Sequence, residues 1–160
     1  MLDFSVRERV RDCAFLTNAS MIAVAQKKHV YIYDQQGVEL HEMKHHYEPK
    51  FLEYLPYHYL LVSGSKRGHI KYQDITTGTM IAEMHSHKGE PMAMTQNAQN
   101  CIIAVGHSYG GVTMWSPNFG KPMVEMLCHP SSVVSTVSFT HDGSHMITTG
   151  LDCKVKIWDT

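Results

Sequence analysis

A strand-like pattern recurs along this chain at intervals of 40, 42 and 43 residues. Four segments share it, and each alternates apolar and polar residues with the period of two that is typical of a β-strand. They read HVYIYD (29–34), HIKYQD (69–74), GVTMWS (111–116) and KVKIWD (154–159). A chain of 160 residues that repeats one short strand four times at nearly constant spacing is predicted to be built from copies of one β unit.

Three further landmarks keep the same spacing. A short apolar run precedes each of these segments: AVAQ (23–26), LVSG (61–64), AVGH (104–107) and ITTG (147–150). A further strand-like run follows the first three: GVELHEM (37–43), GTMIAEM (78–84) and KPMVEML (121–127). Histidines stand 28 to 30 residues before the end of the last three segments: His46, His87 and His129. Four short strands per unit, with a histidine near the start and Trp-Asp ending the third strand, are typical of the WD40 repeat.

The units predict an all-β fold, a WD40 β-propeller of about four consecutive blades. We place the blades at residues 10–43, 46–84, 87–127 and 129–160. Residues 1–9 are expected to supply the outer strand of a preceding blade, and the fourth unit ends after its third strand. Because each blade packs on its neighbours and the ring must close, we expect these blades to belong to a larger ring of about seven blades.

The fourth unit also carries the polar residues that WD repeats join in a buried hydrogen-bond network: His129, Thr148 (or its neighbour Thr149), Asp152 and Trp158. Such a network is satisfied only as a set, so the loss of one member is expected to be costly. The position of Asp152 is occupied in the other units by Lys27, Arg67 and Tyr109, which lack the acidic group. The same His, Asp and Thr could be taken for a catalytic triad, but their place in the repeat favours the structural role.

The string GHSYG (106–110) matches G-x-S-x-G, the nucleophile elbow of α/β-hydrolases. In such an elbow the serine is followed by a helix, whereas here Gly111 opens a strand that ends at the turn Ser-Pro-Asn. The later acid and histidine candidates, Asp142 and His145, fall in the hairpin turn of the next unit. We therefore place Ser108 in a β-hairpin and predict no catalytic residues; a serine hydrolase that uses Ser108 is our third-ranked alternative.

Charge gives one further candidate site. The net charge of −1 argues against a strongly basic nucleic-acid binder. The equivalent turns of adjacent units nevertheless hold two basic pairs, Lys27-Lys28 and Lys66-Arg67. Since repeat geometry places equivalent turns on one face, we predict a basic patch that contacts RNA phosphates or an acidic partner. The alternative is that these side chains merely occupy exposed turns.

Other classes of site are not expected. The twelve histidines and four cysteines fit no zinc-ligand spacing, and no residues suggest a cofactor or a small-molecule substrate. The apolar runs are far shorter than the roughly 20 residues that a membrane helix needs. No secretory signal is visible, so we expect reduced thiols and no membrane partner.

Several stretches that no propeller requires, among them AQKK (25–28), LPYH (55–58) and MTQN (94–97), resemble a known family. It is the nucleolar WD-repeat family associated with U3 small nucleolar RNA in the small-subunit processome, whose members are longer than this chain. The resemblance implies a non-enzymatic scaffold for pre-18S rRNA processing in the nucleolus. It also implies other processome proteins and the pre-rRNA/U3 snoRNP as partners. A generic WD40 scaffold, such as a substrate-recruiting adaptor, is the alternative.

Overall fold

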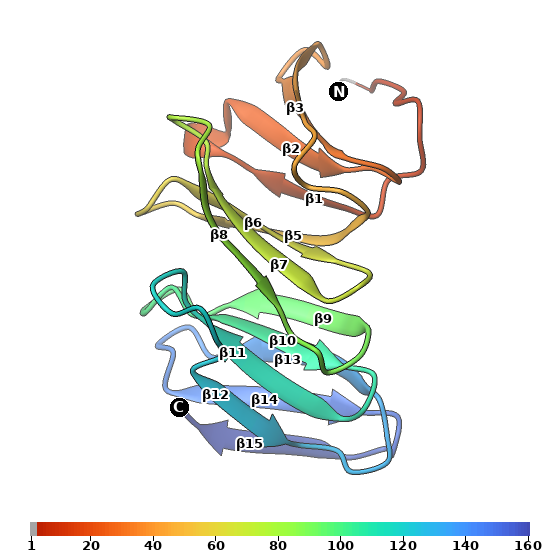
Figure 1. Ribbon diagram of the computed structural model, residues 1–160, viewed down its shortest axis with the longest axis vertical. Helices are drawn as coiled ribbons and strands as arrows, with labels where there is room; N and C mark the ends of the chain where they lie inside the picture. The colour runs from red at the N-terminus through yellow and green to blue at the C-terminus, as the bar shows by residue number, and fades with distance from the viewer. Residues whose placement is uncertain (1–2) are drawn as a thin grey trace.

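Fifteen β-strands and one short 3-10 turn, Thr17–Ala19, make up the computed structural model, which describes residues 3–160 (Figure 1). The first sheet contains β1 (Asp12–Phe15), β2 (Met21–Ala25), β3 (Val30–Asp34) and β4 (Glu39–Met43). The second contains β5 (Pro49–Leu55), β6 (Leu60–Ser65), β7 (His69–Asp74) and β8 (Met80–His85). The third contains β9 (Pro91–Gln96), β10 (Ile103–His107), β11 (Gly111–Trp115) and β12 (Val124–Leu127). The fourth contains β13 (Val134–Phe139), β14 (His145–Gly150) and β15 (Val155–Asp159).

Each sheet is an antiparallel meander whose strands are hydrogen-bonded in sequence order. The sheets follow one another along the long axis of the molecule, as successive propeller blades do (Figure 1). The expectation of an all-β, partial WD40 propeller is confirmed. The fourth sheet has three strands, so β15 is paired on one side only within the described chain. No helix of residues 3–160 has the length and apolar character needed to cross a bilayer.

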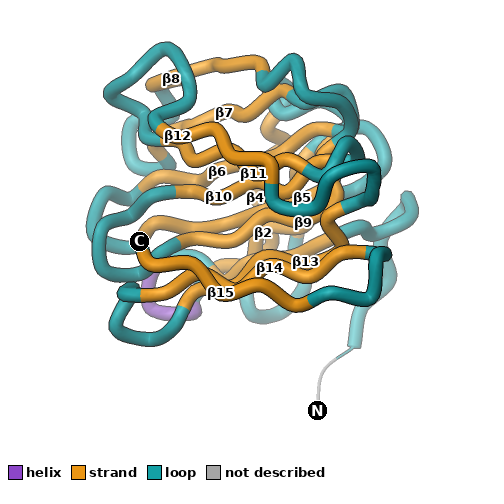
Figure 2. Tube along the Cα trace, turned by 90° about the horizontal axis from the view of Figure 1, so that it is seen from below, coloured by secondary structure: helices purple, strands orange, loops and turns teal. Residues whose placement is uncertain are grey.

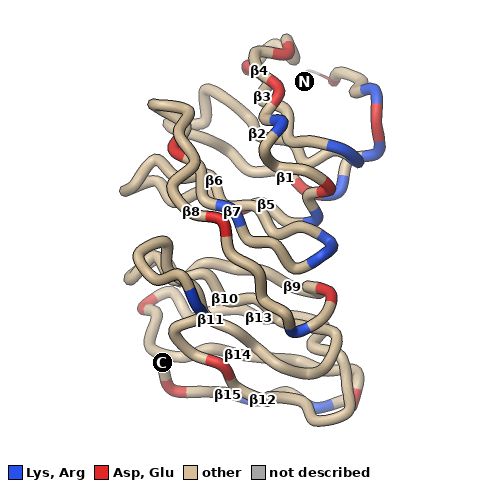
Figure 3. Tube along the Cα trace, viewed as in Figure 1, with Lys and Arg blue, Asp and Glu red and all other residues tan. Residues whose placement is uncertain are grey.

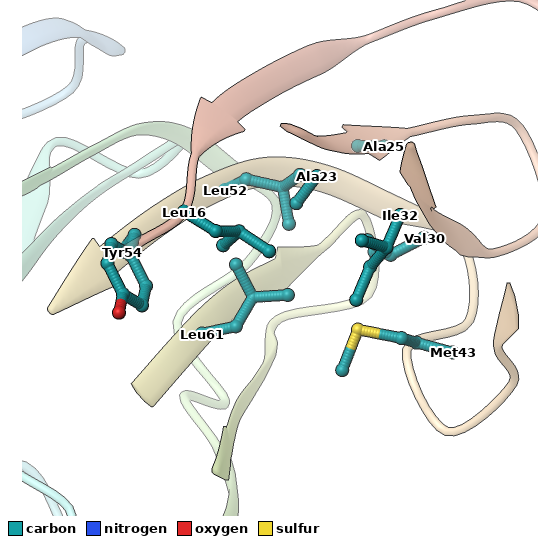
Figure 4. Close-up of a cluster of buried hydrophobic side chains, with 9 residues drawn as sticks. All are labelled: Leu16, Ala23, Ala25, Val30, Ile32, Met43, Leu52, Tyr54 and Leu61. Atoms are coloured by element: carbon teal, nitrogen blue, oxygen red, sulfur yellow. The ribbon is translucent and has the colours of Figure 1, made fainter. Parts of the chain in front are cut away.

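The hydrophobic core lies between the sheets. Figure 4 shows the first of three clusters, in which Ile32 and Met43 of the first sheet meet Leu52 and Leu61 of the second. The second cluster packs Trp115 and its neighbours in the third sheet against the second sheet, and the third cluster joins the last two sheets. Burial of each large aliphatic side chain contributes about 1.5–3 kcal/mol, so blade-to-blade packing supplies much of the stability.

The interface between the third and fourth sheets explains one glycine of the G-x-S-x-G string. A Cβ on Gly106 would lie 2.6 Å from Val134 Cγ1, closer than two carbons can approach. The bare backbone of β10 therefore lets β13 pack directly against it. This glycine serves the packing of two blades.

The two end sheets keep apolar side chains exposed on their outer faces. Phe15 is exposed in the first sheet and Val155 and Ile157 in the last, whereas Leu55, Val112 and Met114 at the corresponding positions of the inner sheets are buried. In the inner sheets, the corresponding faces are covered by a neighbouring blade. This difference is the physical mark of blades that lack a neighbour.

One predicted strand is not formed. Residues 3–9 have no strand, and residues 1–2 of the predicted 1–9 segment lie outside the described part of the chain. The segment instead folds back on the first blade, where the Phe4 ring lies 5.3 Å from that of Tyr33 and against Gly37. An outer strand needs the hydrogen-bonding edge of its own blade, and residues 3–160 contain no strand of a preceding blade.

The turns collect at two opposite ends of the strands (Figure 2). One end carries the turns after β2, β6, β10 and β14 together with the three connections between sheets. The other end carries all remaining turns. The candidate sites predicted from sequence lie at the first of these ends or just beneath it.

Candidate functional site

Backbone hydrogen bonds link the turns and connections at the first end into one continuous rim. The connection 44–48 bonds the turn of the first blade through Glu48 N and Lys28 O (2.8 Å). The next turn bonds this connection in the same way, through Lys66 N and Glu48 O (3.2 Å). Turns and connections remain linked alternately along the rest of the molecule. The bonds are Ser86 N–Gly68 O, Ser108 N–Glu90 O, His129 N–Gly110 O and Leu151 N–Val133 O. The rim residues are thereby fixed relative to one another.

Charge is distributed unequally between the two ends. The rim consists of turns 26–29, 66–68, 108–110 and 151–154 and connections 44–48, 86–90 and 128–133. It contains seven Lys or Arg residues and three acidic ones. The opposite end has one lysine, Lys121, and four aspartates at its turns and strand ends: Asp34, Asp74, Asp142 and Asp159. We call the first end the basic rim; Figure 3 shows the blue segments gathered along that side.

The four predicted patch residues lie on the basic rim but differ in their pairing. Lys28 Nζ is 3.8 Å from Glu8 Oε1, and Arg67 Nε is 3.0 Å from Glu48 Oε2, although both basic side chains are about 70% exposed. Within residues 3–160, Lys27 and Lys66 have no carboxylate within ion-pair distance. The patch therefore offers two unpaired cations and two that are already partly neutralised.

The four predicted network residues of the last blade are joined by hydrogen bonds. His129 Nδ1 donates to the Asp152 carboxylate at 3.0 Å, and the Thr148 hydroxyl donates to His129 Nε2 at 3.0 Å. The same hydroxyl accepts from Trp158 Nε1 at 3.0 Å. This order fixes the His129 tautomer, because a carboxylate only accepts and an indole N–H only donates. Thr148, and not Thr149, is the member of the network.

The other blades contain shorter versions of this network that the sequence did not predict. In the second, His46 lies between Ser63 Oγ (2.6 Å) and Gln73 Oε1 (2.8 Å). In the third, Thr113 Oγ1 accepts from Trp115 Nε1 and pairs with His107 Nε2, both at 2.7 Å. In the first, Gln26 Nε2 donates to the Tyr33 hydroxyl. The repeat spacing was a usable signal for Ser63 and Gln73, which align with Thr148 and Trp158.

Burial and hydrogen bonding hold the pKa values of three of these groups below their ordinary values. Desolvation lowers the pKa of His46 and of His107 to about 4, so both rings are neutral at physiological pH. Partial desolvation would raise the pKa of Asp152, but hydrogen bonds from His129 and the Lys154 amide lower it overall.

Two carboxylates that the sequence did not single out, Asp12 and Glu53, belong to the first strands of their sheets. A cavity of about 500 Å³ is lined by residues of β1, β5 and β9, including Asp12, Glu53 and Gln96. Desolvation, with the nearby Asp12 charge, raises the pKa of Glu53 to about 7. Asp12 is held by the backbone N–H of Leu52, which donates to its Oδ2 at 2.8 Å.

Ser108 lies in the hairpin turn between β10 and β11. A strand follows it, and within residues 3–160 its hydroxyl has no hydrogen bond to a histidine ring. Asp142 and His145 lie at the β13–β14 turn, at the opposite end of the strands. There the Thr140 and Ser144 hydroxyls donate to Asp142. The three residues are thus too far apart to act as a triad.

The described chain contains no grouping of three or more His, Cys, Asp or Glu residues that could bind a metal ion. All four cysteines are free thiols.

Comparisons with known proteins agree with this architecture. The model of the WD domain, G-beta repeat, matches residues 120–159, which span the blade with the full network. The U3 small nucleolar RNA-associated protein 7 of Saccharomyces cerevisiae is 42% identical over 96% of the chain. WD repeat-containing protein 46 is 43% identical over 97% of the chain in Caenorhabditis elegans and 39% over 99% in Homo sapiens.

The chain belongs to the WD40-repeat family of these proteins. It covers 28% of the yeast relative, 27% of the nematode relative and 26% of the human relative, so it spans about a quarter of their length. The resemblance noted in the sequence is confirmed. This WD40 segment matches its relatives from the first blade to the last.

Proposed function

We propose that this WD40 chain is a non-enzymatic scaffold in the biogenesis of the small ribosomal subunit. It acts in the nucleolus, within the U3 snoRNP and small-subunit processome, during processing of pre-18S rRNA. The observation that carries the proposal is the 39–43% identity over nearly the whole chain to relatives that include a U3 small nucleolar RNA-associated protein.

The geometry supports a scaffold. The polar groups that resemble catalytic residues have structural roles. His129, Thr148 and Asp152 are hydrogen-bonded to one another within a blade, and Ser108 lies in the hairpin turn between β10 and β11. The turns, by contrast, form a rigid and accessible rim. Turns positioned by a rigid framework are well suited to binding partners.

The basic rim is the surface that we propose for RNA contact. Lys27 and Lys66 project unpaired charge from adjacent blades, and Lys28 and Arg67 flank them. Phosphate contacts of this kind supply affinity and position but carry no sequence information. The acidic opposite end disfavours the same ligand, so RNA would bind to one end only.

Purification of the tagged chain from cells, followed by identification of its RNA and proteins, tests the proposal. We expect U3 RNA, pre-rRNA and small-subunit assembly proteins. We also expect recovery of the RNA to fall when Lys27, Lys28, Lys66 and Arg67 are all replaced by Glu, but to persist in the Lys121→Glu control at the other end. Recovery of a protein-modifying enzyme without these RNAs would contradict the proposal and favour the adaptor alternative.

A further inference from the structure

A cavity of about 340 Å³ opens at the basic rim, on the outer half of the third blade. The connection from the second blade supplies one wall through His87 and Lys88, and the β10–β11 turn supplies Tyr109. The β11–β12 pair forms the floor, where Gly111 is paired with Leu127 and Thr113 with Glu125. Its volume lies at the lower end of the roughly 300–1,000 Å³ typical of small-ligand sites.

Tyr109 presents an aromatic ring in a fixed position. Tyr109 is 75% exposed, yet one side of its ring packs against Gly89. A Cβ on Gly89, whose φ is +89°, would lie 2.6 Å from Tyr109 Cδ2 and Cε2. The glycine thus permits the ring to lie on the backbone. A large, exposed and pre-positioned ring is suited to stacking on a flat ligand.

Lys88 and Glu125 place one hydrogen-bond donor and one acceptor side by side at the cavity. Lys88 Nζ is 2.7 Å from Glu125 Oε2, and both side chains are about half exposed at the cavity wall. The edges of nucleobases present hydrogen-bond acceptors and donors side by side. A base in the cavity can therefore accept from Lys88 and donate to Glu125.

Additional aromatic and cationic groups lead to the cavity from the second blade. The ring centroids of His69 and His85 are 4.5 Å apart, and those of His85 and His87 are 4.0 Å apart. The rim hydrogen bonds place connection 86–90 directly between the turn that holds Lys66 and the turn that holds Tyr109. Aromatic faces that alternate with basic side chains are how proteins bind single-stranded nucleic acid.

We propose that this cavity holds one nucleobase of a single-stranded RNA, stacked on Tyr109, while the adjoining phosphates lie on the Lys66-Arg67 turn. The inference rests on the RNA contact proposed above and adds to it the strandedness of the RNA and the residues that hold a base. An acidic peptide would be attracted by the same lysines, but its side chains would gain little from an open aromatic face.

Fluorescence anisotropy with a fluorescein-labelled, mixed-sequence single-stranded RNA of about 20 nucleotides tests this site. We expect Tyr109→Ala to weaken binding by about 5- to 150-fold, the effect of losing one base–aromatic stack. The salt dependence of binding should stay unchanged, because no phosphate contact is removed. Tyr109→Phe should bind as the parent does, since it keeps the ring.

Two more variants sharpen the test. Gly111→Val fills the floor of the cavity, and its Cβ has only Met126 O nearby, at 3.6 Å, so we expect weaker binding without loss of the fold. Tyr57→Ala is the matched control: Tyr57 is 80% exposed but lies in the β5–β6 turn at the opposite end. Circular dichroism of each variant verifies the fold.

The outcomes separate this inference from the proposed function. If RNA binds and Lys66→Glu weakens it while Tyr109→Ala and Gly111→Val do not, the RNA contact stands and the base site is overturned. Absence of RNA binding by the parent chain overturns both. Equal affinity for a double-stranded RNA, or Tyr109-dependent binding of polyglutamate that displaces the RNA, also overturns the base site.

Discussion

Replacing Thr148 by Val tests the polar network of the last blade. The substitution keeps the shape of the side chain but removes the hydroxyl that donates to His129 Nε2 and accepts from Trp158 Nε1. An unpartnered buried polar group costs about 1–3 kcal/mol. His129 is fully buried, whereas Trp158 is only partly buried and can recover a bond to water. We therefore expect the free energy of unfolding to fall by about 1–3 kcal/mol, the cost of leaving the His129 ring without its partner.

Urea denaturation followed by tryptophan fluorescence measures this loss, since Trp158 is one of only two tryptophans in the chain. Hydrogen exchange of the β14 and β15 amides locates it in the last blade. Thr149→Val is the matched control: it removes the neighbouring hydroxyl, which bonds Ser135 on the surface at 2.8 Å. We expect this control to lose less than about 1 kcal/mol. A loss for Thr148→Val no larger than that of the control would refute the network as a source of stability.

Three further predictions concern single groups. Because burial lowers the pKa of His46 from 6.5 to about 4, the unfolded chain takes up the proton first as the pH falls. This group alone should lower the free energy of unfolding by about 3 kcal/mol between pH 6.5 and pH 4, in addition to the contribution of His107, and His46→Gln should remove its share of the drop. Burial raises the pKa of Glu53 to about 7, so its ionised form destabilises the fold as pH rises from 4.5; Glu53→Gln should raise the unfolding midpoint in a thermal melt at pH 8. Ser108→Ala should leave stability unchanged, and a fluorophosphonate probe should label neither form; labelling lost in the variant would revive the hydrolase alternative.

The blades could be predicted from the sequence because their spacing is set by local strand and turn chemistry. Alternation over 154–159 and the turn residues around it are sufficient to place β14 and β15 to within a residue or two. The strand expected at 1–9 is absent from the described residues 3–9, because a strand is formed by its partner as much as by its own pattern. Without a neighbouring blade, the segment packs Phe4 against the first blade instead.

The repeat spacing does not identify the buried histidine of the third blade. His87 occupies the same place in its unit as His129, but it is exposed, and His107 of β10 is the buried histidine of the third blade. The cause is one position in β10, where Val105 stands at the place of Thr148 and offers no hydroxyl to a histidine from the connection. The hydroxyl comes from Thr113 on β11 instead.

The sequence predicted the position of the basic turns but not the ion pairs that they form. The turns could be assigned to one end from the repeat, but the pairing of Lys28 with Glu8 and of Arg67 with Glu48 depends on contacts between segments that no spacing rule gives. The cavity beside Tyr109 was missed for the same reason, since its walls come from two blades. The available signal was Tyr109 itself, an aromatic residue at the turn position where the last blade has Asp152.

Ultraviolet crosslinking in cells, followed by sequencing of the RNA attached to the chain, tests the RNA-contacting scaffold most directly. The comparison is between the parent and the variant with Glu at Lys27, Lys28, Lys66 and Arg67, with both proteins shown to be folded and equally abundant. We predict reads on pre-18S rRNA or U3 RNA for the parent and their loss in the variant. Crosslinks that are absent from both proteins, or unchanged by the charge reversal, would contradict RNA binding by the basic rim.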